Sequence, residues 1–304
     1  MNPIILDAGD VFFTKPVLHD STRDSEKYRA SAMLMGYEKI GCDVINVGYY
    51  ELAAGLTFLL ETSASTKIPF ISANLKSSKT NKLLFDPYVI INRNELSVGV
   101  IGLTSLLPAT ERDIKADDYI ETGKIMIDKI KNQVDIIVML VNASQKDQKL
   151  LTKAFSEAGI IYTSGSTLLT RPMMKQLDGG PYLFSTGREA RYINVTELEL
   201  KNDHDPIINV SYLEANQKYN QRKLDRLQDV DITKALDDIY KGQTNILNMI
   251  DESRNNMKHA KDQLKNPTNT LYIKNIPLDA KIIDDEKMLE FVNQSLAVCN
   301  SLKN

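Results

Sequence analysis

The sequence predicts an α/β domain followed by a mainly helical extension. Short β-rich runs alternate with helical stretches over the first two thirds of the 304 residues, which is typical of a layered α/β domain. The unbroken apolar run from Ile136 to Val141 indicates a strand that is buried on both faces. After about residue 212 glycine almost disappears, while Gln, Asn, Lys and Asp become frequent. We therefore expect an α/β domain over residues 1–212 and a helical extension over 213–304.

The elements expected in the α/β domain follow this alternation along the chain. Helical stretches lie over 25–40, 50–63, 123–133 and 145–158. The β-rich runs lie over 4–6, 44–47, 69–73, 88–91, 97–101, 135–141, 159–162, 182–185 and 192–200. In the last of these runs apolar and polar residues alternate, which favours an antiparallel edge strand with one solvated face.

A repeating apolar pattern predicts one long helix in the extension, over 232–264. Apolar residues recur four and three residues apart in turn, and Gln243 and Ser253 fill two skipped positions of this stripe. The stripe can pack against neighbouring helices or the α/β domain, or it can join two copies of the chain. The polar residues in the seam weaken a long autonomous coiled coil. The other elements expected here are a helix around 216–228, a strand over 270–273 and a final helix over 284–302.

The composition excludes several classes of protein. A net charge of −3 does not provide the basic face that a dedicated nucleic-acid binder needs. The chain has three histidines, two cysteines and no tryptophan, which rules out a disulfide framework and leaves little material for a zinc site of His and Cys. No apolar run approaches the ~20 residues that a membrane-spanning helix requires.

Six sequence blocks occur in a fixed order along the first two thirds of the chain. The first and the third read Leu-Asp-Ala-Gly-Asp-Val-Phe (6–12) and Pro-Phe-Ile-Ser-Ala-Asn-Leu (69–75). The others cover 41–55, 98–104, 135–151 and 160–167. Together they resemble the 5′-nucleotidase branch of the calcineurin-like metallophosphoesterases over about residues 4–200. The resemblance implies a four-layer α/β/β/α sandwich and a site at which two metal ions bind phosphate and activate a water.

The residues that the family uses as metal ligands are mostly replaced in this chain. The resemblance assigns Asp10 to the Gly-Asp carboxylate that bridges the metals, and no Asp-x-His strand lies upstream of it. The other family positions, which normally hold the Asn of Gly-Asn-His and four histidines, carry Tyr49, Tyr50, Asn142, Gly165 and Thr167. The histidines present, His19, His204 and His259, match none of these positions. A phenol is a poor substitute for imidazole because its pKa is near ~10 rather than ~6.5.

These replacements lead to three hypotheses about function. In the first, the chain is a catalytically impaired, pseudo-metallophosphoesterase protein that acts as a binding or structural module. In the second, it is an active metal-dependent phosphoesterase that hydrolyses nucleotides or related phosphate esters, with its first ligand strand missing from this sequence. In the third, it binds a nucleotide or sugar phosphate without turnover. We expect no cofactor beyond a weakly bound Mn, Mg or Ca ion at Asp10 and Asn142; alternatively, Asp10 only caps the following turn.

Three other features have a functional and a structural interpretation. The backbone around Ser164 and Ser166 can form an anion-binding nest, or it is a polar loop after a strand. Arg188 can bind phosphate, or it lies in a solvated turn. Tyr49 and Tyr50 can stack on a base or sugar ring, or one packs on the core and the other lines a collapsed cleft.

The expected partners and location rest mainly on the resemblance. A protein partner is expected, either a second copy through the 232–264 helix or a c-type cytochrome, because degenerate relatives occur beside multihaem cytochrome modules. The same resemblance implies an extracytoplasmic protein of the periplasm or cell surface. The chain itself shows no signal peptide, since Pro3 to Asp10 has the pattern of a core strand entering a loop, and a cytoplasmic location therefore stays open.

Overall fold

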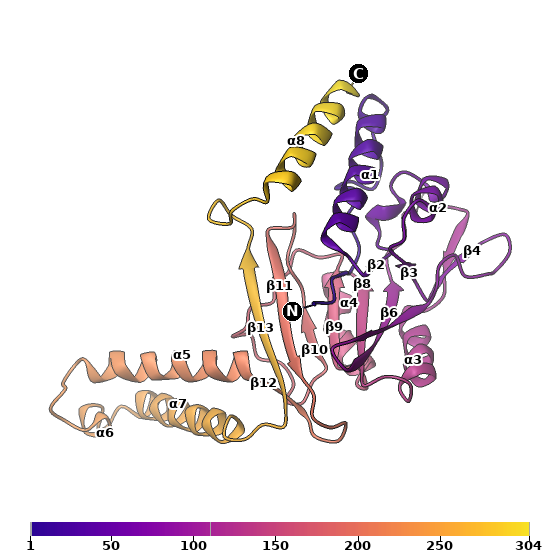
Figure 1. Ribbon diagram of the computed structural model, residues 1–304. Coiled ribbons are helices and arrows are strands. Elements are labelled where there is room, and N and C mark those ends of the chain that lie inside the picture. The colour runs from indigo at the N-terminus through magenta and orange to yellow at the C-terminus, as the bar shows by residue number, and fades with distance from the viewer. Residues whose placement is uncertain (1, 110, 304) are drawn as a thin grey trace. The chain divides into compact units, whose positions relative to one another are not determined.

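The computed structural model describes residues 2–109 and 111–303, and it divides into two compact units (Figure 1). The first unit comprises Met1–Leu169, Pro181–Ile193 and Pro277–Asn304, and the second comprises Thr170–Gly180 and Asn194–Ile276. The division into 1–212 and 213–304 stays a prediction about the domains, whereas by contacts the last helix groups with the first unit.

Two sheets form the centre of the first unit. The smaller one is parallel, in the order β1 (Leu6–Asp7), β2 (Val44–Asn46) and β3 (Phe70–Ile71). The larger one has the order β10-β9-β8-β6-β5, and every neighbouring pair is parallel except β5 and β6. Its strands are β5 (Tyr88–Arg93), β6 (Leu96–Thr104), β8 (Ile136–Asn142), β9 (Ile160–Ser164) and β10 (Tyr182–Phe184). A separate antiparallel pair joins β4 (Leu75–Ser77) to β7 (Ile114–Ala116).

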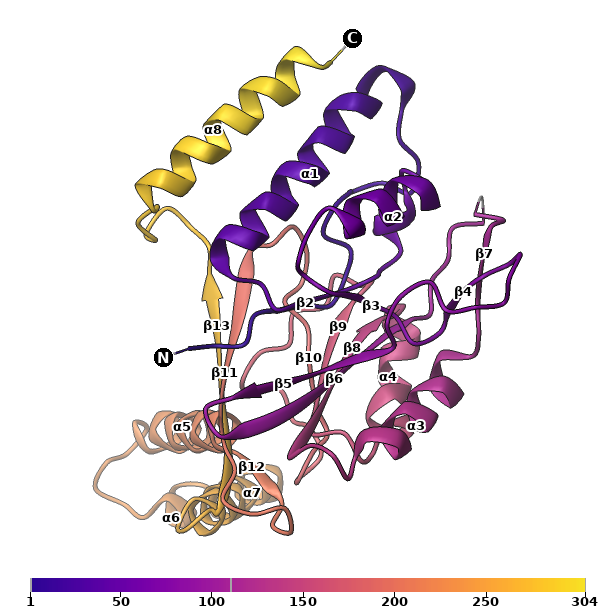
Figure 2. The same ribbon diagram turned by 45° about the vertical axis from the view of Figure 1, so that its right-hand side comes forward.

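Helices cover the outer faces of both sheets, as Figure 2 shows. One apolar core lies between the small sheet and the helices α1 (Arg23–Ile40) and α2 (Leu56–Ala64). A second core lies between the large sheet and the helices α3 (Tyr119–Ile130) and α4 (Gln145–Ala154). β2 and β3 contact β6 directly, so the sheets pack on one another. This mixed α/β arrangement confirms the predicted fold class.

The apolar pattern of the sequence explains the central strand and the first helix. All seven residues of β8 are buried, as the unbroken apolar run predicts. α1 ends at Gly41, which adopts the left-handed conformation (φ 77°) and donates its N–H to the carbonyls of Tyr37 and Glu38. Glycine is the usual residue for this helix end because it has no Cβ to clash.

The second unit contains a three-stranded sheet and a helical hairpin. The sheet has the order β11 (Tyr192–Glu199), β13 (Asn269–Pro277) and β12 (Ile207–Asn209). The hairpin consists of α5 (Val210–Gln228) and α7 (Thr244–Gln263), with the short α6 (Leu236–Ile239) between them. None of the described helices combines the length and the apolar character needed to cross a membrane.

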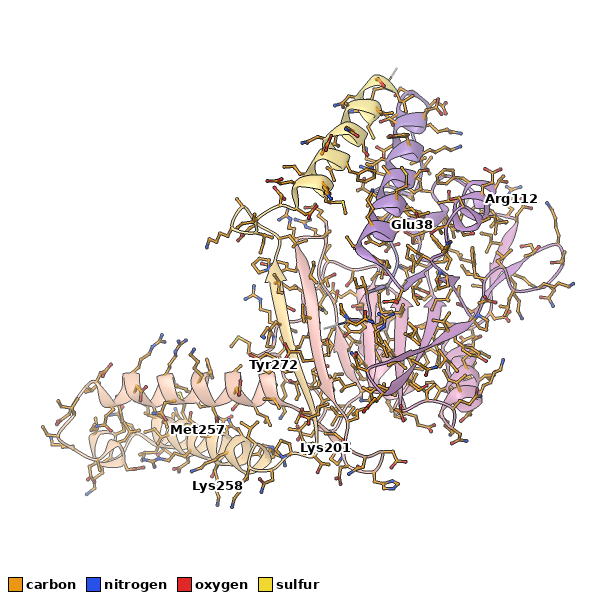
Figure 3. All side chains as sticks on the ribbon, viewed as in Figure 1. Glu38, Arg112, Lys201, Met257, Lys258 and Tyr272 are labelled. Atoms are coloured by element: carbon orange, nitrogen blue, oxygen red, sulfur yellow. The ribbon has the colours of Figure 1, made fainter. Side chains whose placement is uncertain are left out.

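The prediction of a single helix over 232–264 is wrong for residues 232–243. α7 begins only at Thr244, because Gly242 adopts a left-handed conformation (φ 85°) and interrupts the helical chain. The stripe packs inside the chain: Leu236, Tyr240 and Ile250 form a buried cluster with apolar residues of α5. In Figure 3 Met257 lies on the side of α7 that faces α5, and Lys258 points away from it. A dimer through the same seam would therefore have to displace α5.

The final helix, α8 (Glu286–Ser301), belongs to the first unit and packs along α1. The Ser25 hydroxyl donates to the carbonyl oxygen of Cys299 at 2.7 Å, and the Lys39 ammonium lies 5.1 Å from the centre of the Phe291 ring. The two helices run in opposite directions, because the start of α1 meets the end of α8.

Candidate functional site

The residues matched to the family's metal site gather where four parallel strands end. Asp10 follows β1, Tyr49 and Tyr50 follow β2, and Asn142 is the last residue of β8. Ser164 ends β9 and pairs in register with Asn142. Loops at the carboxyl ends of such strands are the usual place for binding sites in α/β folds.

Asp10 occupies the centre of this cluster. Its Oδ1 accepts the backbone N–H of Tyr50 at 2.9 Å, and its Oδ2 accepts an N–H of the Asn142 amide at 2.7 Å. The backbone N–H groups of Tyr49 and Gly165 also act on this carboxylate. Asp10 itself has a positive φ of 70°. Of the nest predicted at Ser164 to Ser166, the N–H of Gly165 therefore acts on the protein's own carboxylate, and anion binding there stays a prediction.

Asn142 uses every polar atom of its side chain. Besides Asp10, its amide group donates to the Ser164 hydroxyl at 2.8 Å, and its Oδ1 accepts the backbone N–H of Tyr49 at 3.2 Å. The Ser164 hydroxyl in turn donates a hydrogen bond to the carbonyl oxygen of Ala8 at 2.7 Å. Flipping the amide would set its oxygen against the Asp10 carboxylate and its NH₂ against an N–H donor, so the network fixes its orientation.

Glu51 connects the loop after β1 with the loop after β2, and sequence reasoning missed this role. Its Oε2 accepts the N–H groups of Asp10 and Gly48, both at 2.7 Å. Its Oε1 accepts those of Val11 at 2.6 Å and Phe12 at 3.2 Å. The side chain is fully buried. Its place as the fourth residue of the Gly-Tyr-Tyr-Glu block was the signal that could have singled it out.

The two loops approach so closely that Gly9 and Gly48 have no room for a side chain. A Cβ on Gly48 would lie 2.6 Å from the backbone nitrogen of Asp10 and 2.8 Å from Oε2 of Glu51. A Cβ on Gly9 would lie 2.8 Å from the backbone nitrogen of Gly48. Real Cβ atoms do not make contacts this short, so both positions require glycine.

One fully buried carboxyl group, that of Glu51, and two half-buried ones, those of Asp7 and Asp10, lie in or beside the site, and the loss of solvent dominates their ionisation. Burial raises the pKa of Glu51 to about 8, with the nearby Asp10 charge as a second cause. Burial also raises the pKa of Asp10 and of Asp7 above the ordinary range. Asp7 accepts the Tyr37 hydroxyl and the N–H of Gly9, each at 2.7 Å, which acts against that rise.

The residues present do not fit a pair of metal ions. Within the described ranges, no group of three or more His, Cys, Asp and Glu residues is arranged to hold a metal. Both oxygens of Asp10 and the side-chain oxygen of Asn142 already accept hydrogen bonds from the protein. Tyr49 and Tyr50 form an edge-to-face ring pair with centroids 5.2 Å apart, and Gly165 has no side chain to offer.

The remaining predicted residues lie apart from this network. The Ser166 hydroxyl donates to Oε1 of Gln148 at 3.1 Å, and Thr167 is exposed. Arg188 is exposed and has Glu189 as its ionic neighbour at 3.9 Å. His19, His204 and His259 are all exposed.

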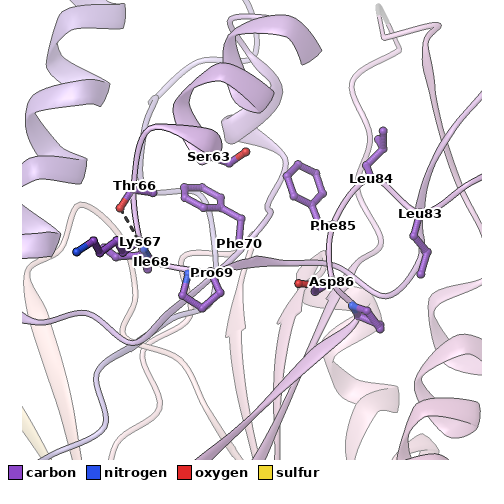
Figure 4. A pocket seen from close by; sticks show the side chains of 11 residues that line it. Ser63, Thr66, Lys67, Ile68, Pro69, Phe70, Leu83, Leu84, Phe85 and Asp86 are labelled. Atoms are coloured by element: carbon purple, nitrogen blue, oxygen red, sulfur yellow. Dashed lines mark hydrogen bonds between the residues drawn. The ribbon is translucent and has the colours of Figure 1, made fainter.

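A shallow pocket of about 490 Å³ lies at the opposite end of β3 (Figure 4). Ile68 and Pro69, which line it, directly precede β3, whereas the site follows the strand ends. Phe70 and Phe85 form its apolar wall, and none of the site residues lines it.

Comparison with known proteins identifies the class of this fold. No protein-family model matches the chain. The solved calcineurin-like phosphoesterase YfkN of Bacillus subtilis aligns with a TM-score of 0.60 over 99% of this chain and 85% of that one, at 15% identity. This similarity shows that the fold is that of the calcineurin-like phosphoesterases.

Sequence relatives narrow the class to one branch. Protein UshA of Salmonella pullorum is 28% identical over 152 residues, which cover 47% of this chain and 26% of the relative. A 5′-nucleotidase of Vibrio parahaemolyticus is 31% identical over 102 residues, 34% of this chain and 17% of that protein. The chain thus spans about a quarter or less of these relatives. The similarities support the 5′-nucleotidase branch of the metallophosphoesterase superfamily.

Proposed function

We propose that this chain is a catalytically impaired 5′-nucleotidase-like protein that acts as a binding or structural module. The hydrogen bond from Asn142 to Asp10, at 2.7 Å, carries this proposal. A metal bridged by Asp10 would need free carboxylate oxygens and a second ligand atom at position 142. Here position 142 presents an N–H donor to that carboxylate, and an N–H group cannot ligate a cation.

The surrounding contacts support the same conclusion. A cation at Asp10 would have to displace the Asn142 amide and lose the bonds that this amide makes to Ser164 and to the Tyr49 N–H. The buried Glu51 carboxylate is also fully used, since it accepts four backbone N–H groups. Any Mn, Mg or Ca ion at Asp10 is therefore a weak, single ion in our proposal.

The test combines metal analysis with a hydrolysis assay. The purified full chain is dialysed against Mn²⁺, its metal content is measured, and its hydrolysis of a panel of nucleotides is compared with that of Asp10→Ala. We expect metal well below one ion per chain and equal, background turnover in both proteins. Stoichiometric metal together with turnover that is lost in Asp10→Ala would overturn the proposal.

An active phosphoesterase is the second candidate, and the family-level similarity to 5′-nucleotidases favours it. It requires ligands from a strand outside this sequence. The same assay separates the candidates, and calorimetry with the nucleotide panel tests binding without turnover. A heat of binding that disappears when Tyr49 and Tyr50 are both changed to Ala would support the stacking role of these rings.

The partner and the location belong to the same proposal. A module without turnover acts through what it binds, and a second copy or a c-type cytochrome is the partner that we propose. An extracytoplasmic location agrees with the family-level similarity to UshA and the 5′-nucleotidases. Fractionation of cells that produce the chain from its own gene tests the location.

A further inference from the structure

Exposed apolar side chains concentrate on α8 and on the segment before it. Seven of the 22 exposed large apolar residues in the described ranges lie between Leu278 and Val298. Among them, Leu289, Val292 and Leu296 are 43%, 41% and 50% exposed. These three residues are three and four positions apart on one helix, so they form a continuous line, which we call the α8 stripe.

The α8 stripe is not the face that holds α8 to α1. The inner face consists of Phe291, Ser295 and Cys299, of which Ser295 and Cys299 are buried. At 100° per residue, the α8 stripe is turned by roughly a quarter of the helix circumference from that inner face. The fold of the single chain therefore leaves the stripe in water.

Opposite charges stand at the two ends of the α8 stripe. Asp285 is the N-cap residue, four residues before Leu289, and Lys303 follows the end of the helix, seven residues after Leu296, so the two charges flank the stripe at opposite ends of α8. Asp285 caps the helix by accepting the N–H of Met288 at 2.9 Å, and Lys303 donates to the Asn300 side chain at 2.8 Å. Neither has an ion pair within residues 2–109 and 111–303.

The α8 stripe with its two end charges matches a second α8 only when the two helices run antiparallel. When a second α8 lies antiparallel, Val292 faces Leu296 of the second copy, and Asp285 faces Lys303, because both pairs are symmetric about position 294. A parallel pair would instead bring Asp285 against Asp285. A self-complementary patch that closes through a two-fold axis is the usual basis of a homodimer, and opposite end charges fix its direction.

We propose that the α8 stripe joins two copies of this chain, which pair antiparallel along α8. Each α8 then contacts its own α1 on one face and the second α8 on a face about a quarter turn away. The apolar stripe of the α5–α7 hairpin takes no part, since its buried residues already pack inside the chain. The pairing uses no residue of the Asp10 network, so it stands or falls independently of the proposed loss of catalysis.

Light scattering on the full chain, over a series of protein concentrations, tests the proposal. The unaltered chain is expected to reach twice the mass of a single chain, and Leu296→Lys is expected to stay monomeric at the same concentrations. Gln294→Lys is the matched control, because it adds the same charge on the side of α8 away from the stripe and should leave the dimer intact. A monomeric unaltered chain, or a dimer that Leu296→Lys leaves unchanged, overturns the proposal.

Disulfide trapping tests the direction of the pair and does not depend on Leu296→Lys folding. A Val292→Cys chain is mixed with a Leu296→Cys chain of a different tag and oxidised. These two positions should cross-link readily, whereas a mixture of Val292→Cys and Leu289→Cys should not. The unaltered chain gives the background of the native Cys42 and Cys299, which are both buried. Equal cross-linking in the two mixtures contradicts the antiparallel register.

Discussion

The loops around Asp10 and the outer face of α8 differ in whether their side chains find partners inside the chain. Around Asp10 the carboxylates of Asp10 and Glu51 and the amide of Asn142 all find partners inside the chain, and these partners are mostly backbone groups. On α8, Leu289, Val292 and Leu296 remain exposed although they lie in line. The polar groups around Asp10 are therefore satisfied inside the chain, whereas the apolar side chains of the α8 stripe have no apolar cover in the single chain.

The largest expected effect is the removal of the Glu51 carboxylate. Glu51→Ala leaves four N–H groups of two adjoining loops without their acceptor, in a fully buried place. We expect a loss of about 3–5 kcal/mol in the free energy of unfolding. Chemical denaturation measures it. The exposed Glu61→Ala on α2 is the control and should stay within about 0.5 kcal/mol; equal losses in both variants would show that Glu51 does not tie the loops.

The second effect is a dependence of stability on pH. Because burial raises the pKa of Glu51 to about 8 from its ordinary value of 4.5, the folded chain holds a proton that the unfolded chain releases between these two values of pH. This contribution is fully present below about pH 4.5 and is lost as the pH rises through about 8. We expect the free energy of unfolding to fall by about 1–3 kcal/mol between pH 5.5 and 8.5.

Denaturation curves at a series of pH values check this slope. The raised pKa values of Asp7 and Asp10 act in the same direction. In Glu51→Ala the slope should become shallower. If the free energy of unfolding rises with pH between 5.5 and 8.5, the pKa values of Glu51, Asp7 and Asp10 are not raised in the folded chain, and the prediction is wrong.

A third prediction concerns the N–H groups that donate hydrogen bonds to the Asp10 carboxylate. Asp10→Gly removes the carboxylate and also relieves the positive φ of 70°, so it should cost less than Asp10→Ala. We expect losses of about 1 kcal/mol and 2 kcal/mol, respectively. Formate should restore part of the melting temperature of Asp10→Gly and leave the unaltered chain unchanged, as thermal shift measurements can show. An identical formate response in both chains would mean that Asp10 does not fill an anion pocket.

The smallest effect is expected on α8. Leu289→Ala should change the unfolding free energy of the monomer by no more than about 0.5 kcal/mol, because this side chain stays in water when the chain folds alone. Ile250→Ala in the buried hairpin cluster should cost about 2–4 kcal/mol. Denaturation at concentrations where the chain is monomeric compares the two. Similar losses would place the α8 stripe in the core of the single chain.

The sequence predicts much of the fold because burial follows local pattern. The run from Ile136 to Val141 is the fully buried β8, and the block order brings Asp10, Tyr49 and Asn142 together at the strand ends. The expectation that the family's metal ligands are replaced rests on the same blocks and stays a prediction.

The rest depends on contacts between distant residues. Three of the four N–H groups that Glu51 accepts lie about 40 positions away along the chain, so the Gly-Tyr-Tyr-Glu block can mark this residue but cannot name its partners. The helix predicted over 232–264 fails because a single residue, Gly242, outweighs a regular apolar repeat. The exposure of Leu289 on α8 could not be inferred from the sequence, because apolar residues occur on more than one side of this helix and the sequence does not show which side packs on α1.

The Asn142 amide has a consequence for how a metal site could be built into this chain. It joins the ends of β1, β2 and β9 through bonds to Asp10, the Tyr49 backbone and Ser164. Replacing it with histidine restores one ligand but removes three contacts at once, while Tyr50 and Gly165 still supply none. A single substitution at position 142 thus loses these three hydrogen bonds and supplies only one ligand. On the proposal that the chain lacks a metal pair, a library of single variants at positions 50, 142 and 165 should contain no phosphatase, because each variant supplies at most one of the missing ligands.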